Sequence, residues 1–550
     1  MADNYDDYSR EELIRELRLR DRRPRFGLVW ERKEIEHEKA INDDFVTLAF
    51  DTELSCGEAP YQNLIVEGDN FDALRYLRMT HAGKVKCIYI DPPYNTGNRD
   101  FIYNDRYVDK EDGYRHSKWL EFMYRRLQLA KELLAEDGVI FVSIDDNEVF
   151  NLGLLMNQVF GEANQVATCV WQKRYSRENR GAIGDAHEYL LVYAINPITF
   201  KLLRNKILPT DKQAAIYKNP NNDPKGPWRV IPMTAQGFRP NQMYEITTPS
   251  GIVHRPPEGR CWSTIEMEFK RLLSEERIWF GKEGKSQPGV IRYFSEVEGV
   301  IPWTWWPHEE VGHTDEARKE IQSIFGTQTA FDTPKPVRLI ERILRIATKP
   351  GDLVLDFFAG SGTTAHAALK LNAEDGGNRR FILVSSTEAT AGEPDKNLCR
   401  DVCAERVRRV VQGYTNKKGE PVAGLGGNPS TPLTTGFAYL RTARLPSETL
   451  FTRIQHADIW IALQLIHTEC FSPFDADAAL QVLQLDGATV VYLPRNTPEA
   501  LAALQSLLDE GYTVVAYSWQ PGQLRQYFQD DRLGVQPIPQ FLVDRFGCGR

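Results

Sequence analysis

The chain has 550 residues, of which 42% are hydrophobic and 26% are charged, a composition that is typical of globular proteins and excludes a disordered chain. This length predicts about two to four domains. The formal net charge of −9 excludes a uniformly basic nucleic-acid-binding protein, so any surface for a polyanion would have to be a local basic face.

The sequence carries no signal for a membrane or for secretion. No apolar run approaches the roughly 18 residues that span a bilayer. The N-terminus is acidic and lacks the apolar core of a secretory signal, so we expect a cytoplasmic protein. Among the eight cysteines only Cys399 and Cys403 lie close together, without a second pair or nearby histidines. That spacing favours reduced thiols and predicts no metal site.

The first elements in chain order are a helical arm and then alternating strands and helices. Residues 1–45 are predicted to be an N-terminal helical arm, because Ser9 and Glu12 fit a capping box. Residues 46–165 have the pattern of one half of a doubly wound α/β domain. Within them, 63–70 predicts a strand and a turn, and the apolar spacing of 71–79 predicts a helix that Asp69 caps.

The next strand ends in an unusual corner. Cys87–Ile90 is a short run of strand formers, and Asp91-Pro92-Pro93-Tyr94 follows it directly. The prolines end the strand, because they cannot donate to a sheet ladder, and they keep Asp91 extended. Such a corner presents a carboxylate, unused backbone carbonyls and a ring, which suits a flat ring that carries an amino group. The alternative is a plain proline turn with Tyr94 as core packing.

Polar and aromatic residues follow this corner. Residues 98–115 are long for a connection inside a domain, which indicates a functional loop or lid. A helix is expected over 119–134 and a buried strand over 139–144.

The α/β alternation breaks over 166–330, where basic and aromatic residues interleave. Residues 165–206 hold seven Lys or Arg against three acids. This pattern suits contact with phosphates and bases, so the segment is predicted to be a DNA-binding insert. The alternative is an irregular domain whose tryptophans are core, including Trp303, Trp305 and Trp306. The candidate DNA contacts are Lys173, Arg174, Arg177 and Arg180.

A second motif lies at 352–368, where an apolar strand that ends at Asp356 runs into a turn of small residues and then a helix. The turn is Phe358-Ala359-Gly360-Ser361-Gly362-Thr363-Thr364. Its glycines allow close approach of the backbone to a nucleotide-type cofactor. It lacks both the Gly-Lys-Ser/Thr of a phosphate loop and the Gly-x-Gly-x-x-Gly dinucleotide fingerprint. A generic strand–turn–helix junction is the alternative.

Two flanking features accompany this turn. Upstream, Lys335 and Pro336 precede a helix expected over 337–346. Downstream, Arg380–Val384 predicts the next strand, and Glu388 just past its end is placed to bind ribose hydroxyls.

The last part of the chain is predicted to be a separate small domain. Residues 416–435 are rich in Gly, Pro, Lys and Thr and indicate a linker. Residues 436–550 then predict a C-terminal α/β domain whose role the sequence leaves open. Its expected elements are helices over 451–466, 498–510 and 523–528 and strands over 488–493 and 513–519.

The order of the motifs carries a family resemblance. Asp91-Pro92-Pro93-Tyr94 comes first, the basic insert follows, and the Phe358–Thr364 turn comes last. This order resembles that of beta-class DNA amino-methyltransferases, and the details are most similar to the modification subunits of Type III restriction systems. The resemblance covers roughly residues 60–415. It implies a Rossmann-like doubly wound methyltransferase fold, with 46–165 as its catalytic half, 166–330 as a target recognition insert and 331–415 as its cofactor half.

The resemblance also implies the site. The catalytic residues would be Asp91, Pro92, Pro93 and Tyr94, with Tyr94 stacking on the target base. S-Adenosylmethionine would be the cofactor, and a Gly-Asp pair at Gly68-Asp69 would lie against its adenine. Its implied contacts are Asp69, Lys335, Asp356, Phe358, Ala359, Gly360, Ser361, Gly362, Thr363 and Glu388.

The implied activity is methyl transfer to N6 of a flipped-out adenine in double-stranded DNA, within a restriction-modification or related phage-defence system. Asp at the first motif position goes mostly with adenine in this family. N4-cytosine methylation, a catalytically silent DNA-binding subunit and a nucleotide-binding enzyme of other chemistry stay open. The expected partners are DNA, a second copy or a restriction or defence subunit, and no membrane. The sequence shows no helicase or nuclease motif.

Overall fold

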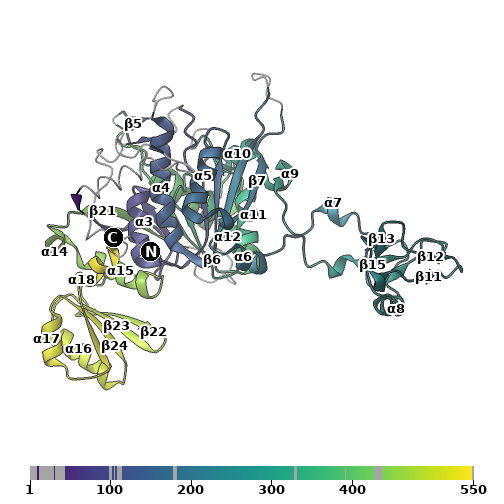
Figure 1. Ribbon diagram of the computed structural model, residues 1–550. Helices are drawn as coiled ribbons and strands as arrows, with labels where there is room; N and C mark the ends of the chain where they lie inside the picture. Colours follow the sequence, from purple (N-terminus) through teal and green to yellow (C-terminus); the bar gives the residue numbers. More distant parts are fainter. Residues whose placement is uncertain are drawn as a thin grey trace. The chain divides into compact units, whose positions relative to one another are not determined.

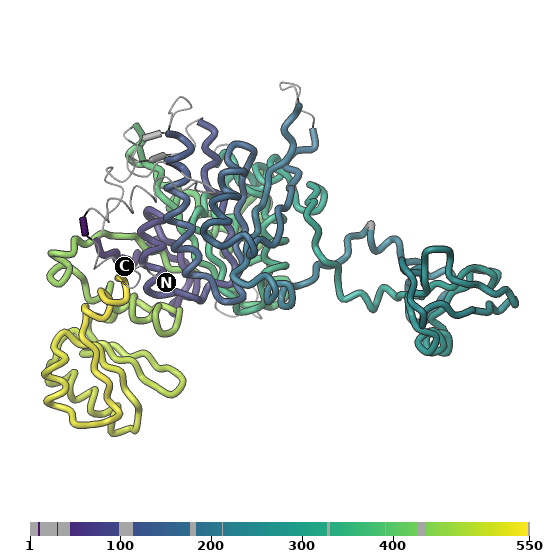
Figure 2. The backbone as a smooth tube through the Cα atoms, viewed as in Figure 1, coloured from purple at the N-terminus to yellow at the C-terminus, as the bar shows by residue number. Residues whose placement is uncertain are grey.

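The computed structural model describes residues 9–10, 30, 44–97, 102–103, 106–107, 114–176, 183–326, 331–390, 392–425 and 436–547 (Figures 1 and 2). The predicted arm over 1–45 and loop over 98–115 fall mostly outside these residues. The chain forms two compact units. The large unit consists of Met1–Asn205 and Trp303–Arg550, and the insert unit consists of Lys206–Pro302.

The large unit is built on one ten-stranded sheet with the order β1-β21-β2-β18-β17-β3-β6-β8-β7-β16. Neighbouring strands are parallel from β21 to β6. β1 and β8 pair antiparallel with their neighbours. The strands are β1 (Phe45–Cys56), β21 (Phe437–Leu445), β2 (Leu64–Glu67), β18 (Arg380–Ser385), β17 (Leu353–Asp356), β3 (Val85–Ile90), β6 (Leu134–Ile144), β8 (His187–Ala194), β7 (Gln165–Gln172) and β16 (Trp305–Trp306).

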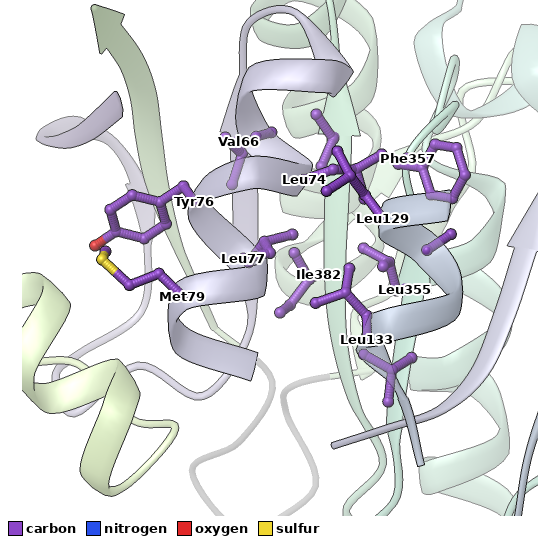
Figure 3. Packing of buried hydrophobic residues seen from close by; sticks show 14 of the residues in the cluster. Val66, Leu74, Tyr76, Leu77, Met79, Leu129, Leu133, Leu355, Phe357 and Ile382 are labelled. Atoms are coloured by element: carbon purple, nitrogen blue, oxygen red, sulfur yellow. The ribbon is translucent and has the colours of Figure 1, made fainter. Parts of the chain in front are cut away.

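Helices cover both faces of this sheet, which explains why its central strands are continuous apolar runs. On one face α3 (Asn70–His81), α4 (Arg115–Leu133) and α5 (Val149–Phe160) pack in series. α11 (Val337–Ala347), α12 (Thr363–Asp375) and α13 (Glu405–Gln412) pack in a second series. Figure 3 shows the first face, where α3 and α4 meet β2, β17 and β18 through Leu74, Leu77, Leu129, Leu133, Val66, Leu355 and Ile382.

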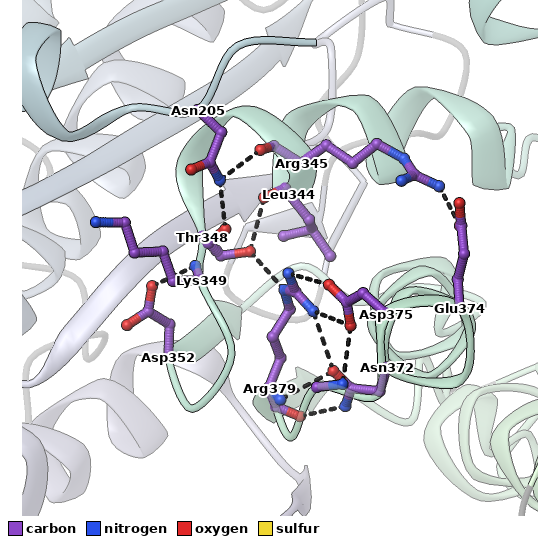
Figure 4. A network of polar contacts seen from close by, with 11 residues as sticks. Asn205, Leu344, Arg345, Thr348, Lys349, Asp352, Asn372, Glu374, Asp375 and Arg379 are labelled. Carbon is purple, nitrogen blue, oxygen red and sulfur yellow. Dashed lines mark hydrogen bonds and ion pairs between the residues drawn. The ribbon is translucent and has the colours of Figure 1, made fainter. Parts of the chain in front are cut away.

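A buried polar network fixes the amino ends of β17 and β18 (Figure 4). The guanidinium of Arg379 donates to Thr348 Oγ1 at 2.9 Å and to Asp375 Oδ1 at 3.0 Å. Asn205 donates to the carbonyls of Arg345 and Thr348, both at 2.8 Å. These bonds tie the C-terminal ends of α11 and α12 to the segments around Asn205 and Arg379 at the amino edge of the sheet. The opposite, carboxyl edge of the sheet is the one where ligands bind in doubly wound folds.

The insert unit is smaller than the insert predicted over 166–330. β7 and β8 belong to the main sheet, because β8 pairs with β6 and β7 pairs with β8. α9 (His308–Val311) and α10 (Thr314–Phe325) also belong to the large unit. Trp306 is buried as expected, whereas Trp303 and Trp305 are 58% and 45% exposed.

The insert unit has a small core of its own. Trp228 and Trp262 are buried there, so they are packing residues. Its elements are α7 (Asp211–Ala214), β9 (Trp228–Pro232), β10 (Thr234–Gln236), β11 (Ile246–Thr247), β12 (Val253–His254), β13 (Arg260–Trp262), α8 (Glu266–Ser274), β14 (Ile278–Trp279) and β15 (Gly289–Tyr293).

The C-terminal region differs from the predicted separate domain over 436–550. β21 is a fully built strand of the main sheet, because Phe437–Leu440 are buried on both faces. α15 (His456–His467) packs on α3 and shares its core. The predicted linker contains β20 (Pro421–Ala423), which pairs with β19 (Gly413–Thr415).

A separate four-stranded sheet does follow, with the order β22-β23-β24-β25 and its own apolar core. Strand 488–493 was predicted with its observed bounds, and the other elements differ at their ends. The elements are β22 (Gln481–Leu485), β23 (Ala488–Leu493), α16 (Pro498–Asp509), β24 (Val514–Ser518), α17 (Pro521–Tyr527), β25 (Leu533–Pro537) and α18 (Gln540–Phe546).

Candidate active site

Four adjacent parallel strands, β2, β18, β17 and β3, bring the predicted site segments to one edge of the main sheet. Asp69 follows β2, Glu388 follows β18, the glycine turn follows β17, and Asp91 follows β3. Parallel strands present their carboxyl ends at a common edge, so segments as far apart in sequence as Asp69 and Glu388 become neighbours.

The Asp-Pro-Pro-Tyr corner is held from behind by a buried tryptophan. The indole Nε1 of Trp119 donates to the carbonyl oxygen of Pro93 at 2.7 Å, and Trp119 is fully buried in α4. The corner was predicted to leave its carbonyls unused, and for Pro93 this is wrong. The bond instead fixes the turn that presents Asp91 and Tyr94.

Lys335 closes the corner from the segment before α11. Its Nζ lies 2.8 and 2.7 Å from the two carboxylate oxygens of Asp91 and donates to the Tyr94 hydroxyl at 2.9 Å. Burial raises the pKa of Asp91, and the ammonium of Lys335 partly opposes that rise. Burial disfavours the ammonium, but the carboxylates of Asp91 and Glu188 outweigh it and raise the pKa of Lys335. Lys335 therefore carries its charge inside the site.

Glu188 in β8 is a member of this site that the sequence prediction did not include. Its Oε2 accepts from the Tyr94 hydroxyl at 2.9 Å and lies 3.4 Å from Lys335 Nζ. The side chain of Glu188 is only 11% exposed. The signal was available, since Glu188 is the only acid in the otherwise apolar strand His187–Ala194 and a buried charge requires partners.

Of the four predicted DNA contacts, the structure describes Lys173 and Arg174. Lys173 is buried, and its Nζ lies 2.8 Å from Asp185 Oδ2 and 3.5 Å from Glu188 Oε1. The ammonium of Lys173 therefore pairs with two carboxylates beside the site, and its prediction as a phosphate contact is wrong for this structure. Arg174 is exposed. Arg177 and Arg180 lie outside the described residues.

The glycine turn is organised around Asp356 at the end of β17. Asp356 Oδ1 accepts from the Phe358 amide at 3.1 Å, and Oδ2 accepts from the Thr364 hydroxyl at 2.5 Å. Burial raises the pKa of Asp356 to about 7, although both hydrogen bonds oppose that rise. Gly360 and Gly362 have φ angles of 49° and 75°, which only glycine adopts without strain.

Arg406 supports this turn from the interior. Its guanidinium donates to Ser361 Oγ at 3.0 Å and to Thr363 Oγ1 at 2.7 Å, and Arg406 is fully buried. The hydroxyls of Ser361 and Thr363, which were predicted as cofactor contacts, are thus turned towards α13. In the structure they shape the turn together with Asp356.

Two partly exposed carboxylates flank the turn. Asp69 caps α3 by accepting from the Phe71 amide at 2.8 Å, and its Oδ2 lies 3.1 Å from Arg126. Glu388 adopts a φ of 53° and lies 3.1 Å from Lys396. The side chains of Asp69 and Glu388 are 47% and 41% exposed, so both can also accept bonds from a ligand.

Among the described residues, no group of three or more His, Cys, Asp or Glu is placed to hold a metal ion. In the same part of the chain, no helix is both long and apolar enough to cross a bilayer.

Comparison with known proteins defines the class to which this fold and site belong. The DNA methylase family matches residues 85–389, a segment that holds the Asp-Pro-Pro-Tyr corner, the insert unit and the glycine turn. The chain belongs to this DNA methylase family. The doubly wound methyltransferase fold predicted from the sequence is confirmed.

Particular relatives are modification enzymes. The chain is 36% identical over 418 residues to the Type III restriction-modification enzyme StyLTI Mod subunit of Salmonella typhimurium, covering 70% of this chain and 61% of that subunit. It is 35% identical over 386 residues to the EcoPI Mod subunit of Escherichia phage P1, covering 60% of this chain and 58% of that subunit. The matches thus span about three fifths of the length of these two Mod subunits.

A shorter relative is covered more fully. The Type II methyltransferase M.KpnI of Klebsiella pneumoniae is 34% identical over 342 residues, covering 58% of this chain and 79% of that enzyme.

Proposed function

We propose that this chain is a site-specific DNA methyltransferase that transfers a methyl group from S-adenosylmethionine to N6 of a flipped-out adenine. The observation that carries the proposal is the convergence of Asp69, Glu388, the glycine turn and Asp91 at the ends of four adjacent parallel strands. Family membership and the similarity to Type III Mod subunits support a role in restriction-modification or a related phage-defence system.

The residues present fit S-adenosylmethionine. Asp69 would accept a hydrogen bond from its adenine amino group, and Glu388 would accept hydrogen bonds from its ribose hydroxyls. The backbone of the turn at Phe358, Ala359, Gly360 and Gly362 would lie against the cofactor. Lys335 would lie beside its methionine end, with its charge already balanced by Asp91 and Glu188. When bound, the cofactor supplies an electrophilic methyl group on a sulfonium.

The corner residues have the chemistry that an exocyclic amino group needs. The lone pair of such a nitrogen is delocalised into the ring, so it is a poor nucleophile. Asp91 and the carbonyl of Pro92 would accept its two hydrogens, draw the nitrogen towards tetrahedral geometry and aim its lone pair at the methyl group. Pro93 holds the corner through Trp119, and the ring of Tyr94 would stack on the flipped base.

The insert unit is the proposed DNA-reading part. Between positions 206 and 302 it carries 14 Lys or Arg and 11 Asp or Glu, a positive excess in a chain whose formal net charge is −9. Exposed Phe238 and Arg239 are of the residue types that contact bases and phosphates. We propose double-stranded DNA as a partner, together with a second copy of the chain or a restriction or defence subunit.

Single-molecule sequencing of DNA from cells that express this chain alone tests the proposal. We expect N6-methyladenine at one short sequence motif and none in cells that express D91A. N4-methylcytosine at the motif would establish the cytosine alternative. A purified chain that binds S-adenosylmethionine and DNA but leaves DNA unmodified would establish the silent-subunit alternative. Binding of NAD or ATP in preference to S-adenosylmethionine would contradict the proposal altogether.

A further inference from the structure

Asp91 accepts three hydrogen bonds in this structure. Both of its carboxylate oxygens lie within 2.8 Å of Lys335 Nζ, and Oδ1 also accepts from the Tyr94 hydroxyl at 2.9 Å. The side chain of Asp91 is nevertheless 24% exposed, so a ligand can reach it. Each donor already on Asp91 weakens its oxygens as acceptors for a target amino group, so the bond to that amino group strengthens when a partner leaves Asp91.

Glu188 offers a second carboxylate acceptor to the two donors that contact Asp91. The Tyr94 hydroxyl has one proton, and its two carboxylate acceptors, Asp91 Oδ1 and Glu188 Oε2, are both 2.9 Å away. It can therefore donate to only one of them at a time. Lys335 Nζ is also within 3.4 Å of Glu188 Oε2. A small shift of the ammonium and a rotation of the hydroxyl would transfer both from Asp91 to Glu188.

We infer that Glu188 is a positioning residue that takes over Lys335 and the Tyr94 hydroxyl when Asp91 turns to the target amino group. This role of Glu188 rests on the proposed methyl transfer and adds one residue to the site that performs it. Without Glu188, the ammonium of Lys335 has Asp91 as its only carboxylate in the corner. The ammonium of Lys335 then stays on Asp91 and weakens the acceptor that the target amino group requires.

Lys173 pairs with the other carboxylate oxygen of Glu188. Its Nζ lies 3.5 Å from Glu188 Oε1, on the side away from Lys335, and 2.8 Å from Asp185. A buried carboxylate needs such compensation at all times. Glu188 therefore keeps a cationic partner on Oε1 while Oε2 faces Tyr94 and Lys335.

The test compares E188Q with a matched control, D185N. Both substitutions remove one carboxylate partner of Lys173, but only Glu188 contacts Tyr94 and Lys335. Single-turnover methylation of a DNA duplex at saturating S-adenosylmethionine should fall at least about tenfold in E188Q. It should stay within about twofold of wild type in D185N. Melting temperatures and cofactor affinity, measured for both, exclude misfolding.

A second comparison separates this role from a merely structural one. In a K335M background the competition for Asp91 is absent, so adding E188Q should cost less than about twofold. E188D, which keeps the charge, should recover part of the rate that E188Q loses. An E188Q enzyme with the wild-type rate would overturn the inference, and so would an equal cost of E188Q with and without Lys335. Absence of methylation by the wild type would instead overturn the proposed function on which it rests.

Discussion

Lys335 and Asp91 lie 244 positions apart in the chain, yet the ammonium of the one contacts both carboxylate oxygens of the other, at 2.8 and 2.7 Å. The bond joins the two halves of the methylase fold, which the insert unit separates in sequence. The Asp-Pro-Pro-Tyr corner and the segment before α11 are thereby held in one polar cluster.

Replacing Asp91 tests the role of this corner directly. D91A removes the carboxylate that would accept a hydrogen of the target amino group, so methylation should fall by at least about 1000-fold. Transfer of a radiolabelled methyl group to DNA measures the loss. Binding of S-adenosylmethionine, followed by calorimetry, should survive, because Asp69, Glu388 and the glycine turn are untouched. Full activity of D91A would contradict the assignment of Asp91.

Removing Lys335 should change the pH dependence of methylation. The pKa of Asp91 is raised by burial and held back by Lys335, and Asp91 can accept a hydrogen bond in the required way only as a carboxylate. In K335M its pKa should rise further, so the acidic limb of the pH–rate profile should move to higher pH. Activity should thus be lost most at low pH and recover as pH rises.

The matched control for K335M is K370M in α12. Lys370 pairs with Glu341 away from the corner and is 46% exposed. Profiles are measured at saturating S-adenosylmethionine, so that a weaker cofactor affinity in K335M does not distort them. An unshifted acidic limb in K335M would show that Lys335 does not set the charge state of Asp91.

The sequence predicted the backbone of the site far better than the partners of its side chains. Asp91 and the glycine turn were found because short apolar runs predict buried strands, and small residues and prolines mark where those strands end. Glu188, Lys173 and Arg406 depend on contacts between distant segments, with Arg406 meeting Ser361 across 45 positions. No local pattern records which way such a long side chain turns.

The same reason explains the displaced domain boundaries. β21 follows a Gly- and Pro-rich segment and resembles the start of a new domain, but it completes the main sheet beside β2. The local sequence of β21 predicts that it forms a strand. The sheet that it joins depends on contacts with distant segments such as β2, which the local sequence does not show.

Asp356 should make the stability of the fold depend on pH. Its pKa is about 7 in the folded chain and about 3.8 when unfolded. Between these values the folded state holds a proton that the unfolded state has released, so this group favours folding less and less as pH rises from about 4 to about 7. D356N lacks the ionisation. Its free energy of unfolding relative to wild type should therefore increase with pH, by a few kcal/mol at most across this range.

Urea unfolding at several pH values between 4 and 8 measures this difference. D375N provides a control whose difference from wild type should stay nearly constant between pH 4 and 8. Partial burial opposes the charge of Asp375, but Arg379 outweighs it and lowers the pKa of Asp375. Asp375 therefore stabilises the fold above its unfolded pKa, and that contribution is lost as pH falls through the lowered value. A difference between D356N and wild type that does not vary with pH would contradict the raised pKa of Asp356.

Gly362 should be needed both for the stability of the fold and for the shape of the turn proposed to bind S-adenosylmethionine. Its φ is 75°, and a Cβ atom there would lie 3.1 Å from the backbone oxygen of Cys403, which cannot move aside cheaply. G362A should destabilise the chain by about 1–2 kcal/mol and weaken S-adenosylmethionine binding, because the turn must shift away from α13.

Gly376 at the other end of α12 is the matched control for Gly362. It has a similar φ of 68°, and a Cβ atom there would meet nothing within 4 Å. G376A therefore carries the backbone strain alone, about 1 kcal/mol, and should bind the cofactor as wild type does. Thermal melts and calorimetric titrations of both variants separate the two effects. Equal losses of cofactor affinity in G362A and G376A would mean that the Gly362 turn has no special part in binding.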